Sequence, residues 1–301
     1  MRYPTFILFA LAAATANADT SGVRAVPTYE SVGLYWSSPP FGWTANGCRV
    51  RYRAVGQSSW KQGHDLWFDA ASNECRGSIV HLAPGTEYEA EVSVTAAKRN
   101  LKFRTWPNRV PVASTVQVPS GSDMLVISAG GTPSGYVVYQ GSPGVLDARN
   151  AAAHNIYINA SYVVVRGFTL KGAAQDAIRL SPNVTDVIIE DNEITGWGRT
   201  RGAGLGVNGD SAIRAICTDG DARLTRVTIQ RNEIHDARFD TNSWSDGHPE
   251  GPQAITFDTC PGNHVIRHNE IFTTNGNYFN DGISGSDNAS TAGFPNHDSD
   301  I

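Results

Sequence analysis

Residues 187–194 read Val187-Ile188-Ile189-Glu190-Asp191-Asn192-Glu193-Ile194. The same pattern, apolar-x-apolar-x-x-Asn-x-apolar, returns at residues 227–234 and 264–271, and an earlier copy at 163–170 has Phe168 in the asparagine position. A second short motif, with isoleucine in its third position, lies between these copies and begins at Asp176, Ser211, Gln253 and Asp281. Two motifs that alternate in this way indicate a chain that passes repeatedly through equivalent strands.

The repeat predicts a solenoid of parallel β-strands. Each coil would pair with the next at a spacing of about 4.8 Å, and inward apolar side chains would form one continuous core. Asn192, Asn232 and Asn269 keep a fixed offset from the flanking isoleucines. We therefore predict that they stack at a bend and hydrogen-bond from coil to coil. The alternative is three solvated asparagines in separate turns.

Residues 20–105 have a different rhythm, with short strands broken by glycine, proline and serine. Val32, Leu34 and Trp36 alternate with exposed-type neighbours, which predicts a half-buried antiparallel strand. The run from Leu82 to Tyr88 has the form of a tyrosine corner, in which the phenol reaches upstream main chain. Residues 106–120 are expected to be a linker or a short entry strand before the solenoid.

Both regions resemble known folds. Residues 19–105 resemble a fibronectin type III β-sandwich, through Trp36 and the tyrosine corner. Residues 121–301 are similar to the right-handed parallel β-helix of the pectate-lyase-like superfamily, through the repeats and the opening at 128–133. The resemblance implies an all-β protein. It also implies a polysaccharide lyase that cleaves a uronate-containing polymer by β-elimination, whereas the polygalacturonase-type Asp-Asp and Gly-His-Gly motifs are absent. Ser299-Asp300-Ile301 matches the start of a further strand copy, so more coils are expected beyond it.

The N-terminus has the pattern of a secretory signal. Arg2 precedes a short apolar stretch, and Ala16-Asn17-Ala18 fits the small-x-small cleavage rule. We predict that residues 1–18 are removed and that the protein is secreted, to the periplasm or the exterior. No other run is long enough to span a membrane.

Composition narrows the function classes. The net charge is −5 and no block of Lys or Arg occurs, which argues against nucleic acid and anionic membranes as partners. Charged residues make up only 18% of the chain and 30 residues are glycine, which excludes coiled coils and helix bundles.

Four cysteines allow three pairings in an exported protein. The repeat alignment places Cys217 four residues after Ile213 and Cys260 five residues after Ile255. It therefore favours Cys217–Cys260, and with it Cys48–Cys75. Metal binding by these cysteines is the weaker alternative, because the sequence has no CxxC pair.

Long insertions indicate the working side of the solenoid. The bare turn from Leu170 to Ile178 covers 8 residues, whereas the equivalent segments ending at Ile213, Ile255 and Ile283 cover 19, 21 and 12. Insertions on successive coils at one corner would lie side by side and form the wall of a groove for an extended polymer, which we expect to be an acidic polysaccharide.

A lyase must offset the charge of the substrate carboxylate and then remove the neighbouring proton. Arg179 and Arg214 share one repeat position and are our candidates for the first task, with an ordinary solvated face as the alternative. His235 and His248, on the longest insertion, are our candidates for proton transfer, whereas His264 is expected in the core. The remaining candidates are Arg199, Arg201, Arg238, Trp244 and Tyr278 for substrate binding, and Asp240, Asp246 and Asp281 for calcium.

Two other functions stay open. A glycoside hydrolase on the same scaffold needs two facing carboxylates, which Asp246, Glu250, Asp258 and Asp281 could supply. The second alternative is a glycan-binding or surface protein without catalysis. Only the lyase creates a C=C bond that absorbs ultraviolet light, and the glycan-binding protein would create no new reducing ends.

Overall fold

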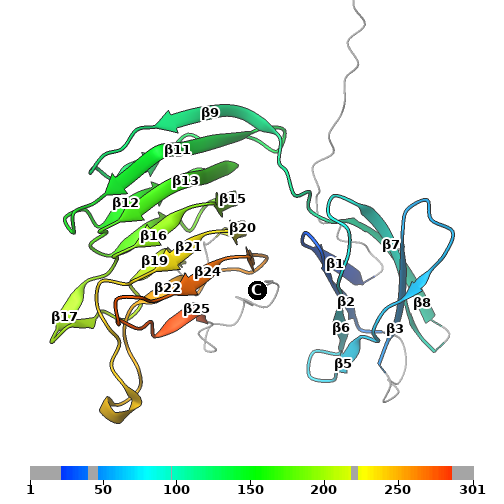
Figure 1. Cartoon of the computed structure of the whole chain (residues 1–301). Helices are drawn as coiled ribbons and strands as arrows, with labels where there is room; N and C mark the ends of the chain where they lie inside the picture. Colours follow the sequence, from blue (N-terminus) through cyan, green and yellow to red (C-terminus); the bar gives the residue numbers. More distant parts are fainter. Residues whose placement is uncertain (1–21, 40–46, 96, 218–222, 287–301) are drawn as a thin grey trace, which may run out of the picture. The chain divides into compact units, whose positions relative to one another are not determined.

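The computed structural model describes residues 22–39, 47–95, 97–217 and 223–286, and within them the protein is all-β apart from one short 3-10 turn (Figure 1). The chain divides into two compact units, Met1–Val110 and Pro111–Ile301, called here the sandwich unit and the coil unit. The predicted signal peptide and the strand copy at Ser299–Ile301 lie outside the described residues. Across the described ranges, the structure contains no helix with the length and apolar character needed to cross a membrane.

The sandwich unit consists of two four-stranded antiparallel sheets. Their strand orders are β1-β2-β6-β5 and β4-β3-β7-β8, the arrangement of immunoglobulin-type sandwiches. The bounds are β1 Val23–Pro27, β2 Val32–Ser37, β3 Arg49–Ala54, β4 Lys61–Gln62, β5 Trp67–Asp69, β6 Glu74–Ile79, β7 Glu87–Val94 and β8 Ala97–Arg104.

Three sequence predictions for this unit are confirmed. Val32, Leu34 and Trp36 are buried between the sheets. The main-chain N–H of Ala83 donates to the Tyr88 hydroxyl at 2.8 Å, which is the tyrosine corner. Cys48 and Cys75 form the expected disulfide, with their Cα atoms 6.1 Å apart.

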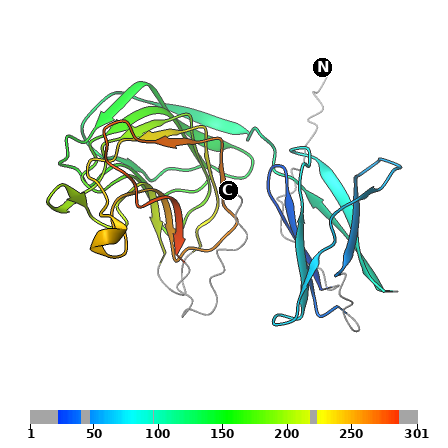
Figure 2. The ribbon, with the colours of Figure 1, turned by 60° about the horizontal axis from the view of Figure 1, so that its bottom comes forward.

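The coil unit is a stack of parallel strands in two sheets. The six-stranded sheet runs β10-β12-β14-β19-β22-β25, so each strand pairs with its equivalent from the next coil. Its strands are β10 Leu125–Ile127, β12 His154–Ile158, β14 Asp176–Leu180, β19 Ser211–Ile216, β22 Gln253–Asp258 and β25 Asp281–Ser286. Figure 2 shows the same stacking from a second direction.

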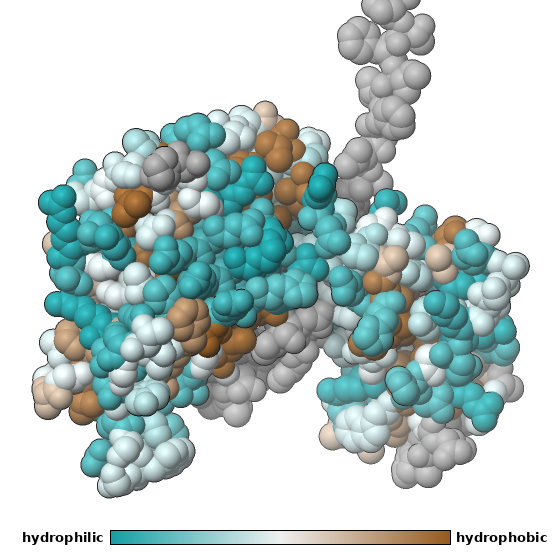
Figure 3. Space-filling view, viewed as in Figure 1, coloured by the Kyte–Doolittle hydropathy of each residue, from teal (hydrophilic) through white to brown (hydrophobic). Residues whose placement is uncertain are grey.

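The second sheet of the coil unit follows the same rule. Its strands are β9 Val112–Val118, β11 Tyr136–Asp147, β13 Val163–Lys171, β15 Thr185–Glu190, β16 Glu193–Thr195, β20 Thr225–Gln230, β21 Glu233–His235, β23 Val265–Arg267 and β24 Glu270–Phe272. The stretch 106–120 contains a strand, β9. It pairs in parallel with β11 and so forms part of the stack. The face seen in Figure 3 is largely hydrophilic, as expected for outward polar side chains.

The three repeated asparagines form a column. Asn192 Nδ2 donates to Asn232 Oδ1 at 2.9 Å, and Asn232 Nδ2 donates to Asn269 Oδ1 at 3.0 Å. Each of the same amides also donates to a main-chain carbonyl of the preceding coil, such as Ile189 O for Asn232. The main-chain N–H of Phe168 donates to Asn192 Oδ1 at 3.1 Å, so the column is capped where the earlier copy lacks asparagine. The predicted ladder is confirmed.

Left-handed residues occupy the corners of the coils. Tyr162, Asp186, Arg226 and Asn263 stand at one corner of successive coils, each with φ between 56° and 67°. Non-glycine residues pay a conformational penalty there. Main-chain bonds between coils offset it, for example Tyr162 N to Thr185 O at 3.1 Å and Arg226 N to Asn263 O at 3.0 Å. Neither the motifs nor the residue types predicted this column.

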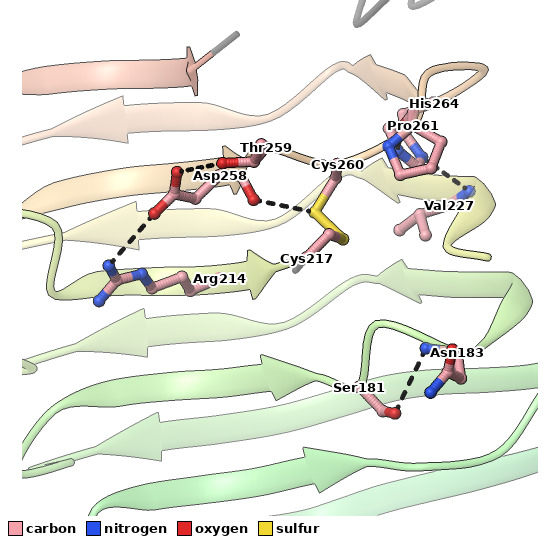
Figure 4. Close-up of a disulfide and its surroundings, with 10 residues drawn as sticks. All are labelled: Ser181, Asn183, Arg214, Cys217, Val227, Asp258, Thr259, Cys260, Pro261 and His264. Carbon is pink, nitrogen blue, oxygen red and sulfur yellow. Dashed lines mark hydrogen bonds and ion pairs between the residues drawn. A yellow bond between two sulfur atoms is a disulfide. The ribbon is translucent and has the colours of Figure 1, made fainter. Parts of the chain in front are cut away.

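A second disulfide joins neighbouring coils. Cys217, directly after β19, pairs with Cys260, the second residue after β22, and their Cα atoms lie 4.9 Å apart (Figure 4). Both cysteines belong to the continuous apolar core of the coil unit. The predicted pairing is therefore confirmed.

His264 lies in this core, as predicted. Its Nε2 donates to the Pro261 carbonyl at 2.6 Å and its Nδ1 accepts from Val227 N at 3.3 Å (Figure 4). Its ring stacks on Phe257. Burial lowers the pKa of His264 from 6.5 to about 4, although the bond to Pro261 works in the other direction. The His264 ring is therefore neutral in the folded protein at neutral pH.

We expect acid to destabilise the protein through His264. Between pH 6.5 and 4 the unfolded histidine gains a proton while the folded one does not, so the free energy of unfolding falls by roughly 3 kcal/mol as pH decreases. Denaturant unfolding at pH 7, 5.5 and 4 measures this. The variant His264→Leu should show a shallower pH dependence; an identical slope in both proteins would contradict the assignment.

Candidate functional site

The outer face of the six-stranded sheet carries a column of polar side chains. Tyr157, Arg179, Arg214, Thr256 and Ser284 are direct partners on successive strands. We call this set the arginine column. The shared position of Arg179 and Arg214 is therefore confirmed by the register of β14 and β19.

Two fully buried carboxylates hold the arginines. Arg179 Nη1 donates to Asp176 Oδ2 at 3.1 Å. Arg199 donates to the Asp210 carboxylate from both Nε and Nη2, at 3.0 and 2.7 Å. Arg214 lies between the two carboxylates, 3.8 Å from Asp176 and 3.9 Å from Asp210. Its side chain is only 11% exposed, so the solvated-face alternative is wrong for this position.

Arg214 retains unused donor capacity. All its carboxylate contacts are longer than a hydrogen bond, including 3.9 Å to Asp258 (Figure 4). Its buried Nε has no hydrogen-bond partner among the described residues. Gly209, at φ +81°, passes so close that an added Cβ would lie 2.8 Å from Arg214 Nη2. The chain is thus shaped to admit this guanidinium.

His154 adds a group that can accept a proton. It begins β12, beside Asp176 at the start of β14. Its Nδ1 lies 3.1 Å from the main-chain oxygen of Asp176. A carbonyl only accepts, so Nδ1 carries the hydrogen and Nε2 carries the lone pair of the neutral ring. Burial lowers the pKa of His154 despite the neighbouring Asp176 carboxylate, and burial raises the pKa of Asp176 despite the bond from Ser211 N and the nearby arginines.

A hydrogen-bonded chain continues the site across three strands. Ser211 Oγ lies 2.8 Å from Thr256 Oγ1, which donates to Gln253 Oε1 at 2.6 Å. Gln253 Nε2 then donates to Asp281 Oδ2 at 3.0 Å. Ser211, Thr256 and Gln253 are buried, so this is a covered polar network that extends from β19 through β22 to β25 along the direction in which the coils stack.

The insertions from successive coils do contact one another. The hairpin of β17 Thr200–Gly202 and β18 Leu205–Gly206 bonds to Asp240 of the next insertion through Gly206 N, at 2.7 Å. Asp240 in turn accepts from Tyr278 N of the following one at 2.8 Å. Figures 1 and 2 show this hairpin and the η1 turn (Trp244–Asp246) projecting from the same side of the coil unit. The insertions thus form one continuous wall.

The two predicted proton-transfer histidines are not brought to the arginines by the main chain. His235 lies on β21, in the other sheet, where it stacks on Phe272 and its Nδ1 lies 2.9 Å from Asp236 Oδ2. His248 is exposed on the η1 insertion, against Trp244 and 2.9 Å from the Pro249 carbonyl. His154 is therefore the histidine beside the arginine column.

The predicted substrate-binding residues divide into held and exposed groups. Arg199 is bound to Asp210, and Arg201 to Glu250 at 2.9 Å. Arg238 lies over the Phe239 ring. Trp244 and Tyr278 are 75% and 62% exposed, which suits stacking against a sugar ring. Trp197 lies between β16 and the β17–β18 hairpin. By contrast, it is fully buried, and its Nε1–H donates to the Gln253 carbonyl.

The predicted calcium ligands do not form one donor set. Asp240 Oδ1 accepts from two main-chain N–H groups, Asp246 accepts from Ser243 within its own turn, and Asp281 accepts from Gln253 and Asn280. In the described ranges no three His, Cys, Asp or Glu side chains gather so as to hold a metal ion. Asp240, Asp246 and Asp281 are therefore not brought together as one set of calcium ligands.

Four residues of the site were missed in the sequence: His154, Tyr157, Asp176 and Asp210. The signal was present in part, because Asp176 begins a motif copy and Asp210 precedes the next one. A buried carboxylate beside a repeated arginine is its natural partner. Of the four predicted hydrolase carboxylates, Glu250 pairs with Arg201 and Asp246 bonds within its own turn. Asp258 lies 3.9 Å from Arg214, and Asp281 accepts from Gln253.

No protein-family model matches the chain, and no curated protein matches it.

Proposed function

We propose that this is a secreted polysaccharide lyase that cleaves a uronate-containing polymer by β-elimination at the arginine column. One observation carries the proposal: Arg179 and Arg214 are in register on neighbouring strands, with neutral His154 and Tyr157 on the next strand. The strand order of the sandwich unit and the stacked coils support the more specific resemblance to a fibronectin type III domain and a pectate-lyase-like β-helix.

The chemistry follows from the donors present. Arg179 and Arg214 would bind the uronate carboxylate, and their charge would stabilise the enolate-like species formed next to it. His154 Nε2 would take the proton from the carbon beside the carboxylate. The electron pair left behind forms the C=C bond as the glycosidic C–O bond breaks. The leaving oxygen takes its proton from the Tyr157 hydroxyl, which water then restores.

Absorbance and reducing ends together test the reaction class. The protein is incubated with pectate, alginate, a glycosaminoglycan and a neutral glucan. A lyase raises both ultraviolet absorbance and reducing ends with one of the acidic polymers only. Reducing ends without absorbance would instead identify a hydrolase, and binding without either would identify a non-catalytic glycan-binding protein.

The variant Arg214→Lys tests the carboxylate-binding role. Lysine keeps the charge but loses the planar fork, so we expect kcat/KM to fall by roughly 10- to 100-fold, the value of one charged hydrogen bond. Arg149→Lys, at an exposed turn of the same unit, is the matched control and should leave the rate unchanged. Equal turnover by both variants would remove Arg214 from the mechanism.

A further inference from the structure

Three asparagines of the chain, Asn46, Asn208 and Asn275, are each followed directly by glycine. Such a pair can modify itself, because the main-chain nitrogen of the glycine is within reach of the asparagine side-chain amide and no Cβ crowds its approach. Asn46 lies outside the described residues. Asn208 and Asn275 have very different surroundings in the structure.

Asn208 and Gly209 are the central residues of a tight turn between β18 and β19. Asp210 N donates to Val207 O at 3.3 Å and Gly209 has φ +81°, as in a type II turn, which favours glycine at this position. Asn208 is exposed, and across the described ranges neither its side chain nor the Gly209 N–H has a hydrogen-bond partner. The attacking nitrogen and the amide carbon are thus neighbours that no hydrogen bond holds apart.

Asn275 is exposed too, but its side chain is held. Its Oδ1 accepts from Asn277 N at 2.9 Å, and its Nδ2 donates to the Ala237 carbonyl at 3.0 Å. Both bonds must break before the amide carbon can turn towards the nitrogen of Gly276. Local opening of this kind slows a reaction according to its free-energy cost.

The first of these turns, between β18 and β19, is built against two arginines of the candidate site. Arg199 closes it at both ends, since Val207 N donates to Arg199 O at 3.0 Å and Arg199 N donates to Asp210 Oδ2 at 2.8 Å. Gly209 packs on Arg214, so that an added Cβ would lie 2.8 Å from Nη2. A change of charge or of chain length in this turn therefore acts on both arginines.

We infer that Asn208 is a site of spontaneous deamidation, which places a new carboxylate in the turn between Arg199 and Arg214. The Gly209 nitrogen loses its proton to a solvent base and attacks Cγ of Asn208. The new C–N bond closes a five-membered succinimide ring as the bond to the side-chain nitrogen breaks, and that nitrogen leaves as ammonia. Water then opens the ring at either carbonyl, which gives aspartate or isoaspartate and returns a proton to the Gly209 nitrogen. Nothing is oxidised or reduced in these steps.

Both products carry a negative charge that asparagine lacks, and isoaspartate also lengthens the main chain by one carbon atom. The ends of the turn are fixed by Arg199, so the extra atom shifts Gly209 relative to Arg214. The added charge lowers the positive potential that both arginines present to a substrate carboxylate. This consequence rests on the proposed function, whereas the modification itself does not. The protein would act less well on its acidic polymer as it ages.

Peptide mapping of the aged protein tests the modification. The full chain is kept at mildly alkaline pH and physiological temperature, sampled over days and digested with trypsin, which places the three asparagine–glycine pairs in three different peptides. Deamidation adds one mass unit. We expect it to be roughly 10-fold faster at Asn208 than at Asn275, whose side chain must first break two hydrogen bonds. In urea, where the fold is lost, the two rates should become similar.

Asn208→Gln is the matched control, because glutamine would have to close a six-membered ring and reacts much more slowly. Its peptide should keep its mass, while Asn275 behaves as in the parent chain. Equal rates at Asn208 and Asn275 in the folded protein, or an unchanged mass at Asn208 in the aged parent, would overturn the inference.

The variant Asn208→Asp carries the charge of the product from the start. On the uronate polymer we expect its kcat/KM to fall roughly 2- to 5-fold at low salt and to recover as salt screens the charge, with Asn208→Gln unchanged. Turnover equal to that of the parent would refute the effect on the site, although a mass change at Asn208 would still establish the modification. If none of the chains cleaves any polymer, the lyase proposal fails and the peptide map still decides the inference.

Discussion

His154→Gln should lower kcat on the uronate polymer by roughly 10²- to 10⁴-fold, the usual contribution of a positioned general base. Glutamine keeps a hydrogen-bonding side chain beside Asp176 but cannot accept the proton. Initial rates of ultraviolet absorbance measure the loss, and thermal unfolding shows whether the fold is retained. In the parent protein, kcat/KM should fall only at pH values below those at which an ordinary histidine titrates. Burial lowers the pKa of His154, so its ring stays neutral to lower pH.

His248→Gln is the control for this prediction. His248 is exposed on the η1 insertion and bonds to the adjacent Pro249 carbonyl, so its loss should change kcat less than 3-fold, roughly the effect of a surface substitution. A large loss with His248→Gln and none with His154→Gln would identify His248, on the insertion, as the general base. That result would also separate proton transfer from the arginine column.

Asn232→Ala should reduce the free energy of unfolding by about 3–5 kcal/mol. Its side chain accepts from Asn192 N and Nδ2, and it donates to Ile189 O and Asn269 Oδ1. Alanine removes all four of these hydrogen bonds between coils, and a buried group left unsatisfied costs about 1–3 kcal/mol. Chemical denaturation of the purified chain measures the difference.

Asn208→Ala is the matched control, because Asn208 is an exposed asparagine of the same unit. Its effect should stay within about 0.5 kcal/mol. Similar stability of the two variants would mean that the asparagine column is not a main source of cohesion between coils.

Much of the fold could be predicted from the sequence because a repeat makes one interaction visible several times. Asn192, Asn232 and Asn269 are far apart in the chain, yet their equal offset from isoleucine revealed the column. The disulfide Cys217–Cys260 followed from the same alignment. The left-handed corners did not, since Tyr162, Asp186 and Arg226 share a conformation but no side-chain chemistry.

The site was less predictable, for a physical reason. Arg179 and Arg214 were identified from their repeat position, but the position does not say which carboxylate meets them. Asp210 binds Arg199 across the base of a hairpin, a contact set by loop geometry that has no periodicity. His154 precedes the repeated insertions, so a search among inserted residues led to His235 and His248 instead.

Insertions accumulate at one corner of the coils, while the left-handed corner at Tyr162, Asp186, Arg226 and Asn263 keeps its spacing to the following strand. A deletion or extra residue at that strict corner would turn over the side chains of the strand that follows it, exchanging interior for surface. The loop-bearing corner has no such constraint. New specificities in a molecule of this build would thus arise by lengthening or grafting loops on a single flank, with the winding scaffold left untouched.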